Sequence, residues 1–178
     1  MPMKSHHVVG SGHRCGAWLE PGQFVAQRPA SFAEEPGRTE MRITRSSIET
    51  MAGPKAWFTG AVHVDAVAAP SPGSRLSASS VHFSPGARTA WHTHPNGQTI
   101  YVTEGVGLVQ RRGGRIEEVR PGDRVFFEPE EDHWHGAAPT RFMTHLAMLE
   151  VDAEGNSAMW GDHVTDDEYS ATPPTEEA

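Results

Sequence analysis

Cysteine is nearly absent from this sequence, and so are long runs of basic or apolar residues. Cys15 is the only cysteine, so no disulfide can form within the chain, and its Gly-rich surroundings favour an incidental thiol over a nucleophile. No run of Lys or Arg offsets the net charge of −8, which argues against a nucleic-acid partner. No apolar run is long enough for a secretory signal or a membrane span. These absences predict a cytoplasmic protein with neither a nucleic-acid nor a membrane partner.

The length of 178 residues suits one domain with a real core. Residues 1–52 contain many Gly and Pro residues and no sustained apolar period, which predicts an N-terminal extension that is largely disordered or loosely packed. A chain beginning at Met41 is therefore expected to fold. Residues 53–165 are predicted to form the folded domain, and residues 166–178 a short C-terminal helix and tail.

Short strand-like segments separated by Gly- and Pro-containing turns dominate the folded part. The segments are 57–65, 76–83, 89–94, 98–104, 106–111, 115–119, 124–128 and 143–151. Helical periodicity is almost absent, apart from a possible helix over residues 166–170. The pattern predicts an all-β domain, either an antiparallel sandwich or a jelly roll.

Histidine is abundant, and five polar residues stand at spacings typical of a metal site. His92 and His94 alternate along a predicted strand, so both side chains face the same side and can share one metal ion. Gln98 opens the next strand after a tight turn and can bring its amide oxygen beside them, or can hydrogen-bond a ligand histidine instead. His133 and His135 repeat the alternation, so either could complete the site. Imidazole ligands favour one divalent transition metal per chain.

The spacing of these residues resembles the first cupin motif throughout, with Gln where most cupins have Glu. The motif reads Gly86-x5-His92-x-His94-x3-Gln98-x6-Gly105. The resemblance implies a single-domain cupin barrel, the double-stranded β-helix.

The second cupin motif is represented by Gly122 and His133. These two residues are 11 positions apart, as the family requires. Pro129 falls one place late, and Glu130 stands where Gly is usual, which affects the local turn rather than the ligand.

A narrower resemblance links the chain to the manganese-dependent cupin hydroxynitrile lyases of bacteria. It lies in residues 57–60, 85–95, 97–99, 133–140, 143–147 and 163–165. The resemblance implies that manganese is the first candidate metal and iron the next. It also implies that His145 is the base, that His135 lines the pocket, and that the metal ligands are His92, His94, Gln98 and His133.

Neutral ligands would leave a divalent ion its full charge, which favours an anionic partner. A small-molecule lyase could use that charge to cleave a cyanohydrin to an aldehyde and cyanide, with His145 as base. The apolar neighbours of His145 on its strand would keep its pKa low. His145 could instead be a buried histidine bonded to backbone. The alternative functions are a metal-dependent dioxygenase and a non-catalytic metal- or ligand-binding cupin.

Assembly is the last expectation. Exposed barrel edges and the strand that contains Trp57 and Phe58 would be covered most simply by a second copy of the chain. The sequence therefore predicts a homodimer or homotetramer.

Overall fold

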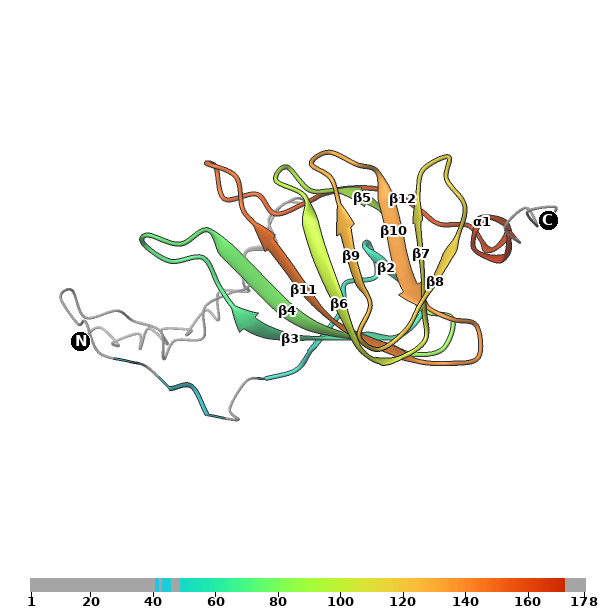
Figure 1. Ribbon diagram of the computed structural model, residues 1–178, viewed down its shortest axis with the longest axis horizontal. Helices are drawn as coiled ribbons and strands as arrows, with labels where there is room; N and C mark the ends of the chain where they lie inside the picture. Colours follow the sequence, from blue (N-terminus) through green and yellow to red (C-terminus); the bar gives the residue numbers. More distant parts are fainter. Residues whose placement is uncertain (1–40, 42, 46–48, 172–178) are drawn as a thin grey trace, which may run out of the picture.

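The computed structural model describes residues 41, 43–45 and 49–171, and in it two antiparallel sheets face each other as a barrel (Figure 1). The first sheet has the order β1 (Met51–Ala52), β3 (Val62–Ala68), β4 (Leu76–Phe83), β11 (Met143–Glu150), β6 (Gln98–Gly105), β9 (Arg124–Phe127). The second has the order β12 (Met159–His163), β5 (Arg88–Thr93), β10 (His133–Ala137), β7 (Gly107–Arg111), β8 (Glu117–Val119), and β2 (Phe58–Thr59) also pairs with β5. The prediction of an all-β domain is confirmed.

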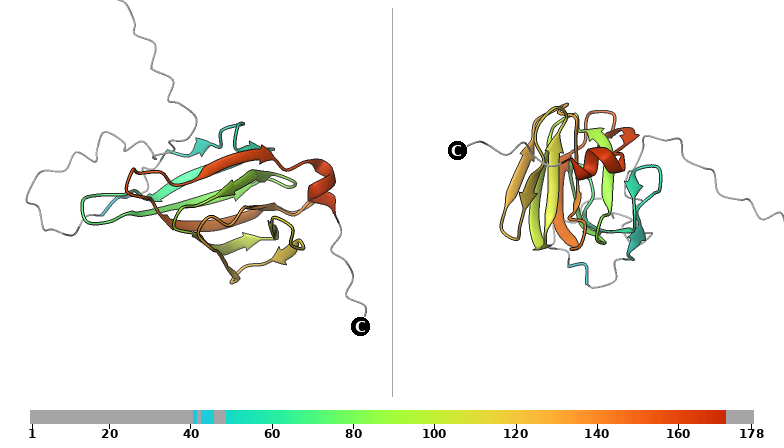
Figure 2. Two further views of the ribbon diagram at one scale, coloured as in Figure 1. Left: turned by 90° about the horizontal axis from the view of Figure 1, so that it is seen from above. Right: turned by 90° about the vertical axis from the view of Figure 1, so that its right-hand side faces the viewer.

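One helix, α1 (Asp166–Ser170), lies at one end of the barrel and faces the viewer in the right-hand view of Figure 2. It has the predicted bounds. Thr165 caps it, because its hydroxyl accepts a hydrogen bond from the Glu168 backbone N–H while the Glu168 carboxylate accepts one from the Thr165 N–H. Among the described residues, no helix has the length and apolar character needed to cross a membrane.

The predicted strands agree with the structure except at residues 57–65, where the prediction of one strand is wrong. Gly60 has a φ of 83° and separates β2 from β3, which belong to different sheets. Phe58 packs against Phe83 and Trp160 within the same chain and is half-buried, and its coverage by a second copy stays a prediction. The strands β1, β10 and β12 are absent from the predicted segments, although the alternation of His133 and His135 is typical of a strand. β1 pairs with β3 just before the expected domain boundary at residue 53.

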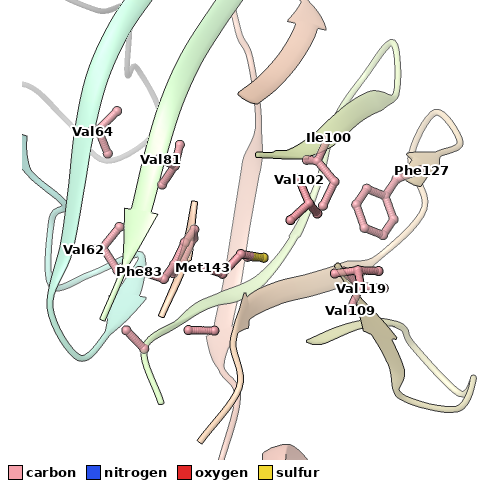
Figure 3. Close-up of a cluster of buried hydrophobic side chains, with 12 residues drawn as sticks. Val62, Val64, Val81, Phe83, Ile100, Val102, Val109, Val119, Phe127 and Met143 are labelled. Atoms are coloured by element: carbon pink, nitrogen blue, oxygen red, sulfur yellow. The ribbon is translucent and has the colours of Figure 1, made fainter. Parts of the chain in front are cut away.

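The main core fills one part of the barrel interior, between the two sheets (Figure 3). Its members are Val62, Val64, Val81, Phe83, Ala87, Ile100, Val102, Val109, Val119, Phe127, Ala137 and Met143. They alternate with outward-facing residues along most of the strands, as expected for sheets that bury one face.

A second apolar cluster covers the outer face of β5 and β10. Trp91 and Trp134 project from these strands against Val164 and Tyr169 of the C-terminal segment. The buried Arg88 guanidinium holds that segment by donating to the Val164 carbonyl oxygen at 2.9 Å and to Asp166, and it lies over the Tyr169 ring. Both faces of β5 and β10 are thereby buried, so the residues that alternate with the tryptophans point into the barrel.

Candidate metal centre and catalytic cavity

The adjacent strands β5 and β10 bring the predicted histidines together. His92 and His133 are directly opposite each other in the antiparallel register. A ring nitrogen of His135 lies within 4.8 Å of ring nitrogens of His92 and His133, and all three side chains are buried. His94 lies outside this group of three, but its ring centroid is 5.0 Å from that of His92 and 5.5 Å from that of His133. The four histidines therefore form one buried cluster.

Three of these rings have the same hydrogen-bonding arrangement. The Nδ1 atoms lie 3.0, 2.6 and 2.7 Å from carbonyl oxygens of Ala90, Ser157 and Glu131, for His92, His94 and His133 respectively. A carbonyl can only accept, so each Nδ1 carries the hydrogen and each Nε2 keeps a lone pair. The Nε2 atoms of His94 and His133 are buried without a hydrogen-bond partner.

Gln98 reaches the cluster because of the tight turn that precedes it. Gly97 donates its N–H to the His94 carbonyl and has a φ of 75°, and a Cβ at this position would lie 2.7 Å from the Phe127 carbonyl oxygen. Glycine is therefore required where the chain reverses. The Gln98 side-chain oxygen is buried and has no partner.

His135 and His145 form a separate pair from β10 and β11. The Nδ1 of His135 lies 3.3 Å from the Nε2 of His145, so one ring donates and the other accepts. The Nε2 of His135 and the Nδ1 of His145 are both buried without partners. His145 is thus a buried histidine that contacts another imidazole, and the Leu146 backbone also interacts with its ring and opposes the lowering of its pKa.

All five histidines are held in the neutral form. Burial lowers the pKa of His133 to about 3 and that of His145 to about 3. Burial also lowers the pKa of His94, and for His92 and His135 the positive charges of neighbouring imidazoles lower the pKa further. Neutral imidazoles with free lone pairs are the form that binds metals and accepts protons.

The inner cavity, of about 110 Å³, opens beside this cluster. Its polar side includes His92, Gln98, His135 and His145, and its apolar side includes Phe58, Val64, Val81, Ala147, Leu149 and Trp160. Ser77 and Ser79 add two hydroxyl groups from β4. The alternation of Ser77 and Ser79 with Val81 along a predicted strand could have identified them as residues that face the cavity. Nothing local in the sequence indicated that Trp160 contacts His92.

The cluster suits a divalent transition metal. Buried lone pairs on imidazole nitrogens and an amide oxygen cost free energy when they have no partner, and a cation would satisfy several of them together. Imidazole ligands whose other nitrogen donates to a backbone carbonyl are the usual arrangement around such ions. The residues present therefore fit a metal ion, and the neutral His135–His145 pair beside it is able to accept a proton.

Known proteins resemble this chain in sequence. The chain matches the cupin domain family over residues 79–147. It is 56% identical over 118 residues to a protein of Granulicella tundricola named (R)-mandelonitrile lyase, a match that covers 66% of this chain and 88% of that protein.

Solved structures agree on the fold. The crystal structure of a cupin-like protein from Thermotoga maritima superimposes with a TM-score of 0.64 and 34% identity, over 77% of this chain and all of the other. A polyketide cyclase from Streptomyces resistomycificus has a TM-score of 0.56 and 21% identity, over 73% of this chain and 90% of the other, which shows the likeness of fold alone. With the motif residues gathered in one barrel, and with these relatives, the chain belongs to the cupin family.

Proposed function

We propose that this protein is a metal-dependent hydroxynitrile lyase that reversibly cleaves a cyanohydrin to an aldehyde and cyanide. The observation that carries the proposal is the buried set of unpartnered imidazole and amide atoms beside a second, separate pair of neutral histidines. A lyase of this kind needs both parts, a centre of positive charge and a base. The name of the Granulicella relative supports the same reaction class.

The proposed metal ligands are His92, His94, Gln98 and His133. The three histidines share the Nδ1 contact with a backbone carbonyl, which orients Nε2 as the ligand atom. His135 differs, because its Nδ1 contacts His145 instead. That difference separates His135 from the ligands although it lies as close to His92 and His133 as a ligand would. One ion per chain is expected, with manganese as the first candidate and iron as the second.

A divalent ion held by these residues would supply Lewis acidity, lowering the pKa of the hydroxyl group of a cyanohydrin in the cavity. The inner cavity itself is small, with apolar side chains opposite the polar ones. Its apolar side limits the contact of water with the reacting carbon, and its polar side presents the histidine pair as proton acceptors.

His145 is the proposed base, and His135 is its hydrogen-bonding partner. One nitrogen of His135 faces the ring nitrogens of His92 and His133, where a cation would oppose the arrival of a proton. His145 lies one ring farther away, and burial keeps it neutral and able to accept.

The proposed cleavage moves one proton and one electron pair. His145 takes the hydroxyl proton as the carbon–oxygen double bond forms, and the carbon–carbon bond to the nitrile breaks with its electron pair leaving on cyanide. His145 then returns the proton to cyanide, which yields hydrogen cyanide and the aldehyde. Addition of cyanide to an aldehyde is the reverse sequence.

Metal content and a small substrate panel test the proposal on one purified sample. We expect about one transition metal per chain, as required for the four proposed ligands, and cyanide release from mandelonitrile in proportion to occupancy. Full occupancy in the double variant His92→Ala, His94→Ala would contradict the ligand assignment. Dioxygen consumption with diketones, in place of cyanide release, would favour the dioxygenase alternative. Failure of both reactions in fully loaded protein would favour a non-catalytic cupin.

A further inference from the structure

Trp160 packs directly against a proposed metal ligand. Its ring stacks on His92, with 4.6 Å between centroids and an angle of 23°. It also stacks on Trp57, with 5.1 Å between centroids and an angle of 5°. Phe58 packs against it at 5.8 Å. Trp160 is therefore held by three aromatic rings, one of which belongs to a proposed metal ligand.

The position of Trp160 is fixed by backbone pairing. In the register of β12 with β5, Trp160 is directly opposite His92. Trp57 is held to the same strand, because its carbonyl oxygen accepts a hydrogen bond of 2.7 Å from the Ala90 N–H. The stack is thus attached on both sides to the strand that carries a proposed ligand.

A second cavity lies on the other side of this stack. The outer cavity, of about 460 Å³, is lined by Trp57, Pro95, Glu130, Asp152, Asn156, Ala158, Met159 and Trp160. Trp57 and Trp160 are the two residues that line both the outer and the inner cavity. The tryptophan pair is therefore the wall between them.

The volumes of the two cavities determine how large a substrate each can hold. Sites for drug-sized ligands usually measure about 300–1,000 Å³. The inner cavity, at about 110 Å³, is far smaller, whereas the outer cavity, at about 460 Å³, falls within that range. On this side of the inner cavity, the wall limits the room for the side group of a molecule that reacts at the metal centre.

We propose that Trp57 and Trp160 set the upper size limit of the substrate, admitting an aldehyde with a side group of about one aromatic ring and excluding larger fused or linked rings. This inference rests on the proposed function for the identity of the reacting group. The size limit itself follows from the two cavities and the stack. Removal of either indole would join the inner cavity to the outer one.

Equilibrium binding of two aldehydes to the metal-loaded protein tests the wall without any cyanide chemistry. Dissociation constants for benzaldehyde and 2-naphthaldehyde, measured by titration calorimetry, give a selectivity ratio for each variant. We expect the parent to prefer benzaldehyde. We expect Trp160→Leu to shift the ratio toward 2-naphthaldehyde by about tenfold or more, the effect of making room for several carbon atoms.

Met159→Ala is the matched control. Met159 precedes Trp160, is 64% exposed and lines the outer cavity but not the inner one. Its truncation therefore enlarges the outer cavity without opening the wall. Its selectivity ratio should stay within about twofold of the parent, since no contact with the inner cavity is lost. Trp57→Leu is the second test variant, and it leaves the contact between Trp160 and His92 in place. It decides the question if Trp160→Leu does not fold.

The outcomes separate the two proposals. Equal affinity of the parent for both aldehydes, an unchanged ratio in the folded tryptophan variants, or an equal shift in Met159→Ala would overturn the size limit. A shifted binding ratio in a protein that releases no cyanide from mandelonitrile would uphold the wall and overturn the lyase assignment. Cyanide release with an unchanged ratio would do the reverse.

Discussion

At the scale of single residues, the proposed role of each histidine rests on the nitrogen that it leaves without a hydrogen-bond partner. His94 and His133 donate from Nδ1 to backbone carbonyls, and their buried Nε2 atoms have no partner. His135 instead places its Nδ1 against His145. His133 and His135 lie on the same strand, and the partner of the second nitrogen is the reason for proposing two different roles for them.

Substitution of the proposed base should separate catalysis from metal binding. We expect His145→Ala to keep its metal yet to cleave a cyanohydrin about 10²–10⁴ times more slowly, the usual range for loss of a general base. His82→Ala is the control, because His82 bonds to Thr144 at 2.9 Å outside the inner cavity. Steady-state kinetics with metal analysis on the same samples measure both effects. A metal-loaded His145→Ala enzyme as fast as the parent would leave His135 as the candidate base.

Gln98→Glu, unlike His145→Ala, should change the binding of the metal as well as the rate of turnover. A carboxylate adds negative charge where the neutral amide oxygen is buried without a partner. We expect tighter metal binding and slower turnover, because the added charge offsets part of the field of the cation. Competition with a chelator measures the first effect and the initial rate of cyanide release the second. Weaker metal binding in Gln98→Glu would argue that Gln98 is not a ligand.

The buried histidines also predict how the metal-free protein responds to acid. An unfolded chain protonates its histidines near pH 6.5, whereas burial lowers the pKa of His133 and of His145 to about 3 in the fold. Their neutral forms favour folding above pH 6.5, and this contribution is lost as the pH falls from 6.5 toward 3. Each such histidine lowers the free energy of unfolding by about 1.4 kcal/mol for every pH unit in that window. Urea unfolding at pH 7.5 and 5.5 measures the loss, and equal stability at both values would contradict it.

At the scale of elements, β5 and β10 carry the site because both of their faces are buried. Trp91 and Trp134 pack under the C-terminal segment, while the alternating histidines line the interior. Arg88 and the α1 capping box fix that segment. The short strand β12 then continues the support by placing Trp160 opposite His92.

The two motif glycines Gly105 and Gly122 allow a matched test of backbone packing. Both have positive φ, of 79° and 95° respectively. An added Cβ at Gly105 would lie 1.9 Å from the Phe142 carbonyl oxygen, whereas an added Cβ at Gly122 would meet no neighbouring atom within 4 Å. We expect Gly122→Ala to lower the free energy of unfolding by about 1–2 kcal/mol from φ strain alone. Gly105→Ala should cost more than about 4 kcal/mol, or prevent folding, because a backbone atom has to move. Urea unfolding compares them, and equal losses would contradict the packing argument.

At the scale of the whole molecule, the described strands and their pairing begin at Met51. We expect a chain beginning at Met41 to keep its metal and to melt within about 2 °C of the full chain, a shift that corresponds to less than about 1 kcal/mol. A chain beginning at Gly53 is the control, because it loses the pairing of Met51 with Val64 and should melt lower. Thermal unfolding with metal analysis measures both. A large drop for the Met41 chain would show that the preceding residues stabilise the barrel. Assembly into a homodimer or homotetramer stays a prediction.

The sequence by itself determined what depends on local geometry. Alternation on a strand put His92 and His94 on one side, and Gly97 in the turn returned Gln98 beside them. The bounds of β4 and α1 were also predicted from the sequence, and the capping box of Thr165 and Glu168 explains where α1 begins.

Tertiary structure decided what depends on residues distant in the chain. Glu130 shows the limit of a motif, because it adopts a φ of 60° where the family usually has Gly, held by its N–H donating to the His94 carbonyl. The contact of Trp160 with His92 comes from strand register. The hydrogen bond of His135 to His145, on which the proposed choice of His133 as the ligand rests, likewise joins two strands. Periodicity shows which side of a strand a residue faces, but only the pairing of strands shows what lies opposite it.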